Sequence, residues 1–255
     1  MHDKTKDVTA KDLMADTPKP PISSAFGHVD TWGHVNTWVF DLDNTLYPPD
    51  SALWPQIDAR ITAYLMNLYG LDGISARALQ KYFYHKYGTT LKALMDQGDA
   101  DADHFMGFVH DIDRTSLGIN SALSDALGRL PGRKLILTNG SCKHAEDTAK
   151  ALGILQHFEA IFDIKAAGFV PKPDPVAYQI FFDKHSVDPK RAAMFEDLVK
   201  NLKAPHDAGM KTVLIVAKSG IVDERDEWER RQDRPSFVEY VTDDIAGFLT
   251  NLPGS

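Results

Sequence analysis

The chain has 255 residues, of which 43% are hydrophobic and 25% charged, and its formal net charge is −8 at pH 7. These values are typical of a soluble globular protein with one large or two modest domains. The acidic charge argues weakly against binding to nucleic-acid polymers, which depends on a basic surface, although a bound cation could still attract a small anionic substrate.

Three features bear on the compartment. Cys142 is the only cysteine, so no intrachain disulfide can form and a reducing compartment is favoured. No run approaches about 18 consecutive apolar residues, so no membrane-spanning helix is predicted. Residues 1–33 are rich in lysine and proline and lack the apolar core of a signal peptide, which predicts a disordered N-terminal tail. We expect a cytoplasmic protein, monomeric or homodimeric, that binds no membrane.

The first predicted strand covers residues 36–42, with Val39 and Phe40 as its last buried residues. Two carboxylates, Asp41 and Asp43, stand one residue apart at its end. Because an open α/β sheet binds ligands beyond the carboxyl ends of its strands, both acids should face a site for a cation or a phosphate. Taken alone, the pair could equally be an acidic turn capped by Asn44.

The block from about residue 51 to 124 has apolar residues at helical spacing and is predicted to be all-helical. Expected helices cover residues 54–68 (ended by Gly70), 75–87 (capped by Ser75 and stopped by Gly88), 91–95, 105–112 and 120–130. Helices inserted after the first strand would stand above the two carboxylates as a lid. We therefore predict a helical cap over residues 52–124 and an α/β core over residues 34–51 plus 125–255.

From Arg133 onward the pattern alternates between strand and helix. Strands are predicted over residues 134–137, 160–164, 192–195, 211–216 and 237–241. Helices are predicted after Ser141 and over residues 174–185, 198–208 and 243–249, with a polar loop or surface helix over 218–235. This alternation indicates right-handed βαβ units and a mostly parallel, Rossmann-like sheet.

Three further polar elements follow later strands. Residues 138–141 (Thr-Asn-Gly-Ser) offer a hydroxyl and main-chain amides at a helix start, which suits phosphate oxygens, although a capped turn explains them equally well. Lys172 lies between two prolines that stiffen its loop, and it could offset the charge of a carboxylate or phosphate or be an ordinary exposed lysine. Asp197 and Asn201 stand four residues apart after a strand, a spacing that suits a hard cation or a simple N-cap.

Together and in this order, these four elements closely resemble the haloacid dehalogenase superfamily of aspartyl phosphotransferases, over residues 37–249. The resemblance implies a parallel-sheet core with an inserted cap, and catalysis through an aspartyl phosphate. Asp41 corresponds to the nucleophile and Asp43 to the general acid/base that protonates the leaving alkoxide and then activates water. Lys172 corresponds to the lysine that steadies nucleophile and phosphate.

The same resemblance assigns the phosphate and metal ligands. Thr138 corresponds to the phosphate-binding hydroxyl, with Asn139 and Gly140 beside it. Asp197 corresponds to the acid that binds Mg²⁺, together with Asp41 and the main-chain carbonyl of Asp43. The chain departs from the family pattern at two positions, because Glu196 stands where many relatives have Gly and Asn201 where many have Asp. Either could reach the metal directly or through water.

Asp43 also bears on the reaction. It must be protonated for the first step, and we expect burial and proximity to Asp41 to raise its pKa. The resemblance implies that a dehalogenase does not use an acid at this position and that phosphonate hydrolases lack it, whereas a phosphosugar mutase would keep it. Hydrolysis of a phosphate monoester is the reaction predicted.

A narrower resemblance is to the pyrimidine 5′-nucleotidase branch, carried by residues 38–48, 87–91, 109–113 and 195–197. It implies a nucleoside monophosphate as substrate. The cap positions that could then meet ribose or base are Tyr87, Thr89, Thr90, His110 and Asp111. Alternatives are a phosphatase of phosphoglycolate or a sugar phosphate, a phosphosugar mutase, and a non-catalytic phosphate-binding protein.

Overall fold

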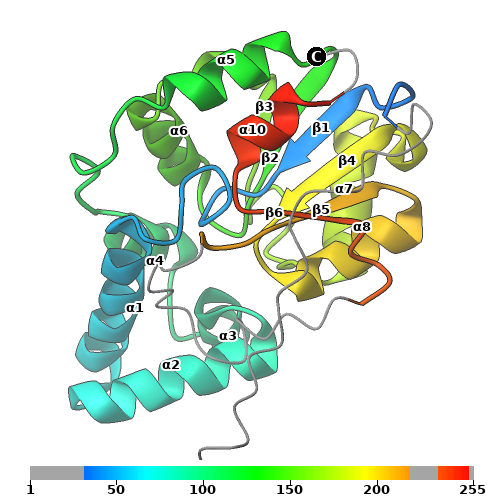
Figure 1. Cartoon of the computed structure of the whole chain (residues 1–255). Helices are drawn as coiled ribbons and strands as arrows, with labels where there is room; N and C mark the ends of the chain where they lie inside the picture. Colours follow the sequence, from blue (N-terminus) through cyan, green and yellow to red (C-terminus); the bar gives the residue numbers. More distant parts are fainter. Residues whose placement is uncertain (1–31, 219–234, 253–255) are drawn as a thin grey trace, which may run out of the picture.

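A computed structural model of the chain describes residues 32–218 and 235–252 (Figure 1). The tail predicted over residues 1–33 and the segment predicted over 218–235 therefore lie almost wholly outside the described residues. No described helix combines the length and apolar composition that crossing a bilayer requires.

The core is a six-stranded parallel sheet, as the alternating pattern predicted. Its strands run in the order β3-β2-β1-β4-β5-β6. They are β1 (Thr37–Phe40), β2 (Arg133–Leu137), β3 (Ala160–Phe162), β4 (Ala192–Glu196), β5 (Lys211–Ile215) and β6 (Tyr240–Thr242). In the register of the sheet Phe40 lies between Ile136 of β2 and Phe195 of β4. The segments that follow these three strands therefore emerge next to one another at one edge.

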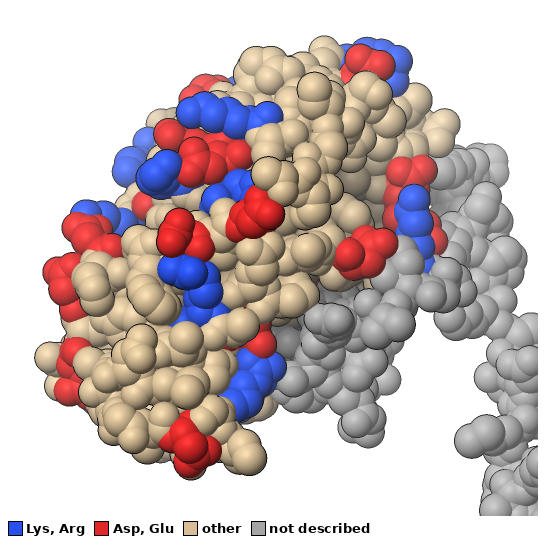
Figure 2. All heavy atoms as spheres, turned by 90° about the vertical axis from the view of Figure 1, so that its left-hand side faces the viewer, with Lys and Arg blue, Asp and Glu red and all other residues tan. Residues whose placement is uncertain are grey.

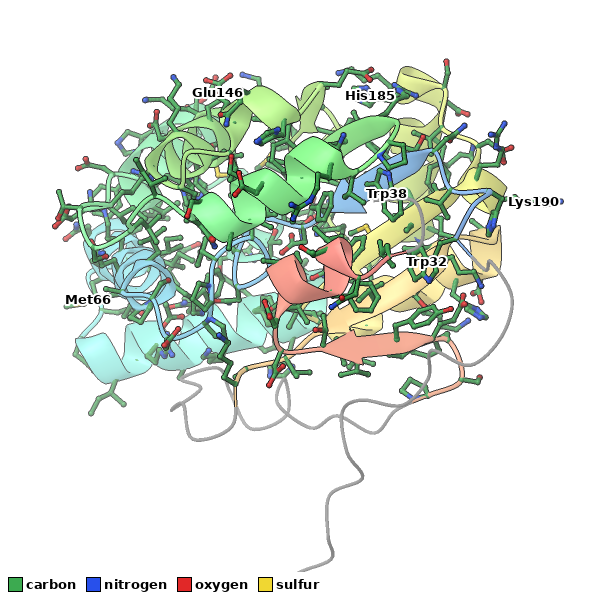
Figure 3. The ribbon with its side chains drawn as sticks, turned by 45° about the horizontal axis from the view of Figure 1, so that its top comes forward. Trp32, Trp38, Met66, Glu146, His185 and Lys190 are labelled. Carbon is green, nitrogen blue, oxygen red and sulfur yellow. The ribbon has the colours of Figure 1, made fainter. Side chains whose placement is uncertain are left out.

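Helices cover both faces of this sheet, because successive residues of a strand point to opposite sides. Trp38 and Phe40 face a cluster with α5 (Ser121–Arg129), α6 (Cys142–Ala151) and α10 (Ile245–Thr250). Val39 faces a second cluster with α7 (Pro175–His185), while α8 (Lys203–Ala208) lies on that side too. Figure 3 labels Trp32 and Trp38, whose rings stack with centroids 5.9 Å apart and extend the first cluster toward α10. Both faces of the sheet are thus buried, which explains its continuous apolar strands.

The insertion after β1 is helical, as predicted, and its helices α1 to α4 pack around a core of their own. They are α1 (Leu53–Tyr69), α2 (Gly73–Tyr87), α3 (Thr90–Gln97) and α4 (Ala102–Val109). Leu65, Phe83 and Phe105 are among the buried side chains of this third cluster. Helix α5, which the predicted boundary at residue 124 divides, packs instead against α10 on the sheet.

Capping and helix-breaking residues in the sequence predicted several of the helix ends. Gly70 ends α1 with a φ of 65°, a left-handed conformation that glycine adopts without strain. The predicted cap of α2 was wrong: the carboxylate of Asp72, not Ser75, accepts the N–H groups of Ile74 and Ser75. The helix predicted over residues 198–208 is also divided, into a 3₁₀ helix (Val199–Leu202) and α8. Pro205 has no N–H to donate and is tolerated only in a first helical turn, so the regular helix begins just before it.

Acidic and basic side chains lie interspersed over the face drawn in Figure 2. Several described charges are paired, as in the contact of Arg60 with Asp111 at 3.1 Å. On this face the described lysines and arginines do not form a continuous basic patch of the kind that binds a polymeric phosphate backbone.

Candidate active site

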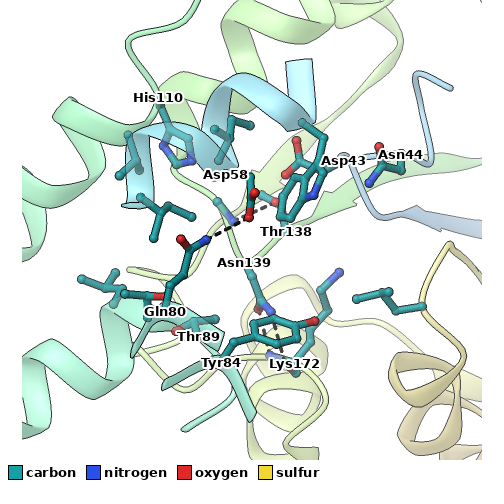
Figure 4. Close-up of a pocket in the computed structure, with 18 of the residues that line it drawn as sticks. Asp43, Asn44, Asp58, Gln80, Tyr84, Thr89, His110, Thr138, Asn139 and Lys172 are labelled. Carbon is teal, nitrogen blue, oxygen red and sulfur yellow. Dashed lines mark hydrogen bonds between the residues drawn. The ribbon is translucent and has the colours of Figure 1, made fainter. Parts of the chain in front are cut away.

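The polar residues that follow β1, β2 and β4 meet in one pocket between core and cap (Figure 4). The core side is lined by residues from all four sequence elements. They are Asp41, Asp43, Thr138, Asn139, Gly140, Lys172, Glu196, Asp197 and Asn201. The cap side is formed by side chains of α1, α2, α3 and α4. All nine predicted core positions therefore lie together at the carboxyl edge of the sheet, where an α/β sheet binds its ligands.

A buried ion-pair network joins the strand ends. The ammonium group of Lys172 donates to Oδ1 of Asp41 at 2.6 Å, to Oε2 of Glu196 at 2.8 Å and to the main-chain carbonyl of Leu137 at 2.9 Å. All three donors of the ammonium are thereby used, and its side chain is only 2% exposed. Oδ2 of Asp41 accepts no hydrogen bond from the described residues, so that this oxygen is left for the reaction or for a cation.

The ionisable groups in this network shift one another's pKa values. Burial and the neighbouring Glu196 raise the pKa of Asp41, and because Lys172 only partly offsets them, that pKa is raised to about 8. Burial alone would lower the pKa of Lys172, but the charges of Asp41 and Glu196 outweigh it and raise that pKa well above its ordinary value. Lys172 is therefore a fixed positive charge.

The loop of Lys172 is held by Asn139. The amide oxygen of Asn139 accepts the main-chain N–H of Lys172 at 2.8 Å, and its amide nitrogen donates to the carbonyl of Lys172 at 3.1 Å. Because both ends of this side chain are used, any contact of Asn139 with a phosphate would be made by its main chain. Thr138 is also engaged, since its hydroxyl accepts the N–H of Gly140 at 2.9 Å. A phosphate bound at this loop would replace the hydrogen bond between Gly140 and Thr138 by hydrogen bonds to its own oxygens.

Asp43 lies on the other side of the pocket and has partners of a different kind. Its Oδ1 accepts from the hydroxyl of Tyr47 at 2.6 Å and is 2.9 Å from Nε2 of His144, the first-turn residue of α6. Burial raises the pKa of Asp43, but the charge of a protonated His144 and the hydrogen bonds from His144 and Tyr47 outweigh it and lower that pKa to about 2. The expectation of a raised pKa was therefore wrong in direction. With a neutral His144 the contribution of its charge is lost, and the hydrogen bonds from His144 and Tyr47 are what oppose the effect of burial.

The acidic residues on the sheet edge suit a divalent cation. Asp41, Glu196 and Asp197 are buried, and their ligand oxygens lie within 4.8 Å of one another. The amide oxygen of Asn201 is buried and finds no hydrogen-bond partner in the part of the chain that the structure describes. Carboxylate and amide oxygens are the ligands that Mg²⁺ prefers, so the donor set fits this ion. Glu196 is committed elsewhere, because Oε2 accepts from Lys172 and Oε1 from the N–H of Leu198 at 3.3 Å.

Comparison with known families agrees with this geometry. Residues 35–209, more than half of the chain, match the model of haloacid dehalogenase-like hydrolases. The chain belongs to the haloacid dehalogenase-like hydrolase family.

Solved structures of such hydrolases share the fold. A haloacid dehalogenase-like phosphatase from Thermococcus onnurineus is 16% identical, with a TM-score of 0.56 over 87% of this chain and 99% of that one. An L-2-haloacid dehalogenase from Xanthobacter autotrophicus, with chloropropionic acid covalently bound, is 14% identical, with a TM-score of 0.51 over 84% and 97%. A family protein from Streptococcus pneumoniae is 15% identical, with a TM-score of 0.52 over 85% and 97%. At these identities the likeness shows the fold, and it spans both core and cap.

The sequence singled out five cap positions of this hydrolase, and only some of them line the pocket. Thr89, Thr90 and His110 line the pocket, whereas Tyr87 and Asp111 are not among its lining residues. Tyr87 packs edge-on against Phe83, and the carboxylate of Asp111 is 81% exposed. Burial, followed by the charge of His144, lowers the pKa of His110 to about 3, so that this ring is neutral near pH 7.

Sequence reasoning missed the residues of this hydrolase that surround Asp43 and those that form the cap wall. His144 could have been found, because Ser141 caps α6 and a first-turn residue three positions later points back toward the strand ends. The cap wall includes a polar cluster around Asp58, whose carboxylate pairs with Arg77. It also accepts from Gln80 at 2.9 Å, and Figure 4 labels this pair. These residues come from two helices with no motif to mark them.

Proposed function

We propose that this hydrolase cleaves phosphate monoesters with the help of Mg²⁺, through a phosphoryl group carried on Asp41. The observation that supports this most is the placement of Asp43, whose side chain lines the pocket. An alkoxide leaving group needs a proton from such an acid, whereas a halide leaves as a stable anion and needs none. Asp43 therefore favours phosphate ester hydrolysis over the dehalogenation that the same fold also supports.

In the first step, an oxygen of Asp41 attacks phosphorus while the bond from phosphorus to the ester oxygen breaks. Asp43 gives its proton to that ester oxygen, which leaves as an alcohol. In the second step, water gives a proton to Asp43 and attacks the phosphorus of the aspartyl phosphate. The bond to Asp41 breaks and inorganic phosphate is released. Splitting the transfer in this way replaces one difficult displacement by two easier ones.

The residues around Asp41 offset the repulsion between a carboxylate and a phosphate dianion. Lys172 holds Oδ1 of Asp41 in place and supplies a permanent positive charge. Thr138, Asn139 and Gly140 line the pocket beside it, where the hydroxyl and the main-chain N–H groups would bind the phosphoryl oxygens. Mg²⁺, when bound by Asp41, Asp197 and the main-chain carbonyl of Asp43, supplies further positive charge at the phosphoryl group. Asn201 keeps an oxygen for this ion, and Glu196 serves chiefly to anchor Lys172.

We further propose that the leaving group is a pyrimidine nucleoside. The cap wall combines an apolar part, which includes Trp54, Ile57 and Phe105, with the polar cluster of Asp58, Arg77 and Gln80. A nucleobase has a flat apolar face and a polar edge, which match such a wall. Tyr84 also lines the pocket and offers a ring for stacking, at a position fixed by a hydrogen bond from Lys200 at 2.8 Å.

A substrate panel with purified protein and Mg²⁺ tests both the phosphatase activity and the nucleotide substrate. It includes UMP, CMP, phosphoglycolate, a sugar phosphate and, for halide release, 2-chloropropionate. We expect phosphate release that Asp41→Asn abolishes; release undiminished in this variant, or halide release instead, would refute the phosphatase. A mutase would interconvert phosphosugars without releasing phosphate.

The nucleotide assignment is tested separately through the cap. Faster turnover of UMP and CMP than of the smaller esters is expected. Tyr84→Leu should lower kcat/KM for UMP while leaving phosphoglycolate unchanged, and the matched variant Tyr87→Leu, outside the pocket, should change neither. Equal turnover of all esters would remove the nucleotide assignment and leave the phosphatase standing.

A further inference from the structure

The carboxylate of Asp43 is bound on one side only. Oδ1 accepts the hydroxyl of Tyr47 at 2.6 Å and lies 2.9 Å from Nε2 of His144. Tyr47 is 1% exposed and the His144 side chain is fully buried, so both partners lie behind Asp43 in the core. Oδ2 accepts no hydrogen bond from the described residues, and Asp43 lines the pocket with 17% of its side chain exposed.

The tautomer of His144 follows from its second partner. Nδ1 of His144 lies 2.8 Å from the guanidinium of Arg114. Because arginine can only donate, Nδ1 must accept, and the ring proton is then on Nε2, from which it is donated to Asp43. The ring of His110 stacks on His144 with centroids 4.3 Å apart and planes 9° apart, and Nδ1 of His110 lies 3.0 Å from the hydroxyl of Ser141. These contacts fix the plane of the His144 imidazole and favour the tautomer with its proton on Nε2.

Arg114 lies on the segment between α4 and α5, where the chain returns from the cap to the core. Its guanidinium also donates to the carbonyls of His110 and Ile112 and to the hydroxyl of Thr148 on α6, each at 3.2 Å. One arginine therefore ties the end of the cap to the helix that carries His144.

We propose that Arg114 and His144 are positioning residues for the acid/base, holding Oδ1 of Asp43 in the core so that its proton is carried on Oδ2, facing the leaving group. With two donors on Oδ1, a proton on the carboxyl can occupy only Oδ2. The proton given to the ester oxygen and the proton later taken from water then pass through the same atom. This inference rests on the proposed phosphatase activity.

The positioning role of His144 is tested by comparing kcat for substrates with poor and good leaving groups. An alkyl phosphate needs the proton from Asp43, whereas p-nitrophenyl phosphate has a good leaving group and needs it little. His144→Leu should lower kcat for the alkyl ester at least tenfold more than kcat for p-nitrophenyl phosphate, with KM nearly unchanged. His144→Gln, whose amide N–H can replace Nε2–H, should restore most of that loss. His157→Gln, a histidine remote from the pocket, serves as the matched control and should change neither rate.

Two results would overturn the inference. One is an equal loss of kcat for both esters in His144→Leu, which would indicate general damage to the site rather than a misplaced Asp43. If His144→Leu does not fold, Arg114→Met is measured in the same way, with the same difference between esters expected. The other is a ¹⁵N NMR spectrum of the wild-type protein in which Nδ1 of His144 carries the proton. If the wild type with Mg²⁺ hydrolyses neither ester, the proposed phosphatase activity is refuted, and this inference with it. The NMR measurement reports the tautomer of His144 and does not depend on activity.

Discussion

Replacement of Lys172 by methionine removes the one charge that joins Asp41 to Glu196 while keeping a long apolar stem. The variant loses three hydrogen bonds, of 2.6, 2.8 and 2.9 Å, and leaves two buried carboxylates without their cation. Breaking a buried ion pair by removing one partner costs about 3–5 kcal/mol. We expect Lys172→Met to lower the free energy of unfolding by that amount at about pH 9.5 in EDTA, where the Asp41 of the wild type is ionised.

The loss should depend on pH in a stated direction. The pKa of Asp41 is raised from the ordinary 3.8 to about 8, so the folded protein holds a proton that the unfolded chain gives up between these values. The stability that this proton confers is present at low pH and is lost as the pH rises through about 8. Without Lys172 the pKa of Asp41 rises further. At pH 5.5 the wild type and the variant both carry a neutral Asp41, whereas at pH 9.5 only the variant still holds this proton, so the deficit should shrink to about 1–3 kcal/mol at pH 5.5, that of an unmade hydrogen bond.

Urea unfolding followed by circular dichroism at both pH values measures the effect. Lys165→Met is the matched control, because Lys165 pairs with Asp103 at 2.9 Å while their side chains are 61% and 74% exposed. Exposed pairs contribute about 0–1 kcal/mol, so this control should differ little from the wild type. A deficit for Lys172→Met below about 1 kcal/mol at pH 9.5, or one as large at pH 5.5 as at pH 9.5, would refute the reasoning.

Two further predictions concern the metal and the backbone. Because the pKa of Asp41 is raised to about 8, protons compete with Mg²⁺ for it, and calorimetry should show weaker binding at pH 6 than at pH 8.5, with proton release; equal affinities would contradict this. A Cβ on Gly132 would lie 2.3 Å from the carbonyl oxygen of Asn36, whereas one on Gly70 would meet nothing within 4 Å, and both residues have positive φ. Gly132→Ala should therefore cost about 1–3 kcal/mol more than Gly70→Ala in urea unfolding, and similar costs would show that the backbone relaxes.

The sheet edge was predictable because each of its elements is local. A short apolar run followed by a polar residue marks a strand end, and parallel strands bring such ends to the same edge. Asp41, Thr138 and Asp197 could therefore be expected to meet before any contact between them was known. Their adjacency in space follows from β1 lying between β2 and β4.

The partners of Asp43 were not predictable in this way. His144 is 101 positions away in the sequence, and its approach depends on how one face of α6 packs against the sheet. The polar cap cluster likewise depends on the packing of α1 against α2, since Asp58 and Gln80 are 22 positions apart. Propensity alone also could not choose between Asp72 and Ser75 as the cap of α2, because both side chains are good caps.

The two carboxylates that begin the site have opposite electrostatics although one residue separates them. Burial and Glu196 raise the pKa of Asp41 to about 8, while hydrogen bonds from His144 and Tyr47 act to lower the pKa of Asp43. The proposed reaction needs the reverse order, with Asp41 ionised to attack and Asp43 protonated to give up its proton. Positive charge beside Asp41 and Asp197 would lower the first pKa, and a phosphate dianion beside Asp43 would raise the second. In the proposed mechanism the order of the two pKa values would therefore be set by the charges of what binds, and we expect Asp41 and Asp43 to become competent together when a cation and a phosphate ester share the pocket.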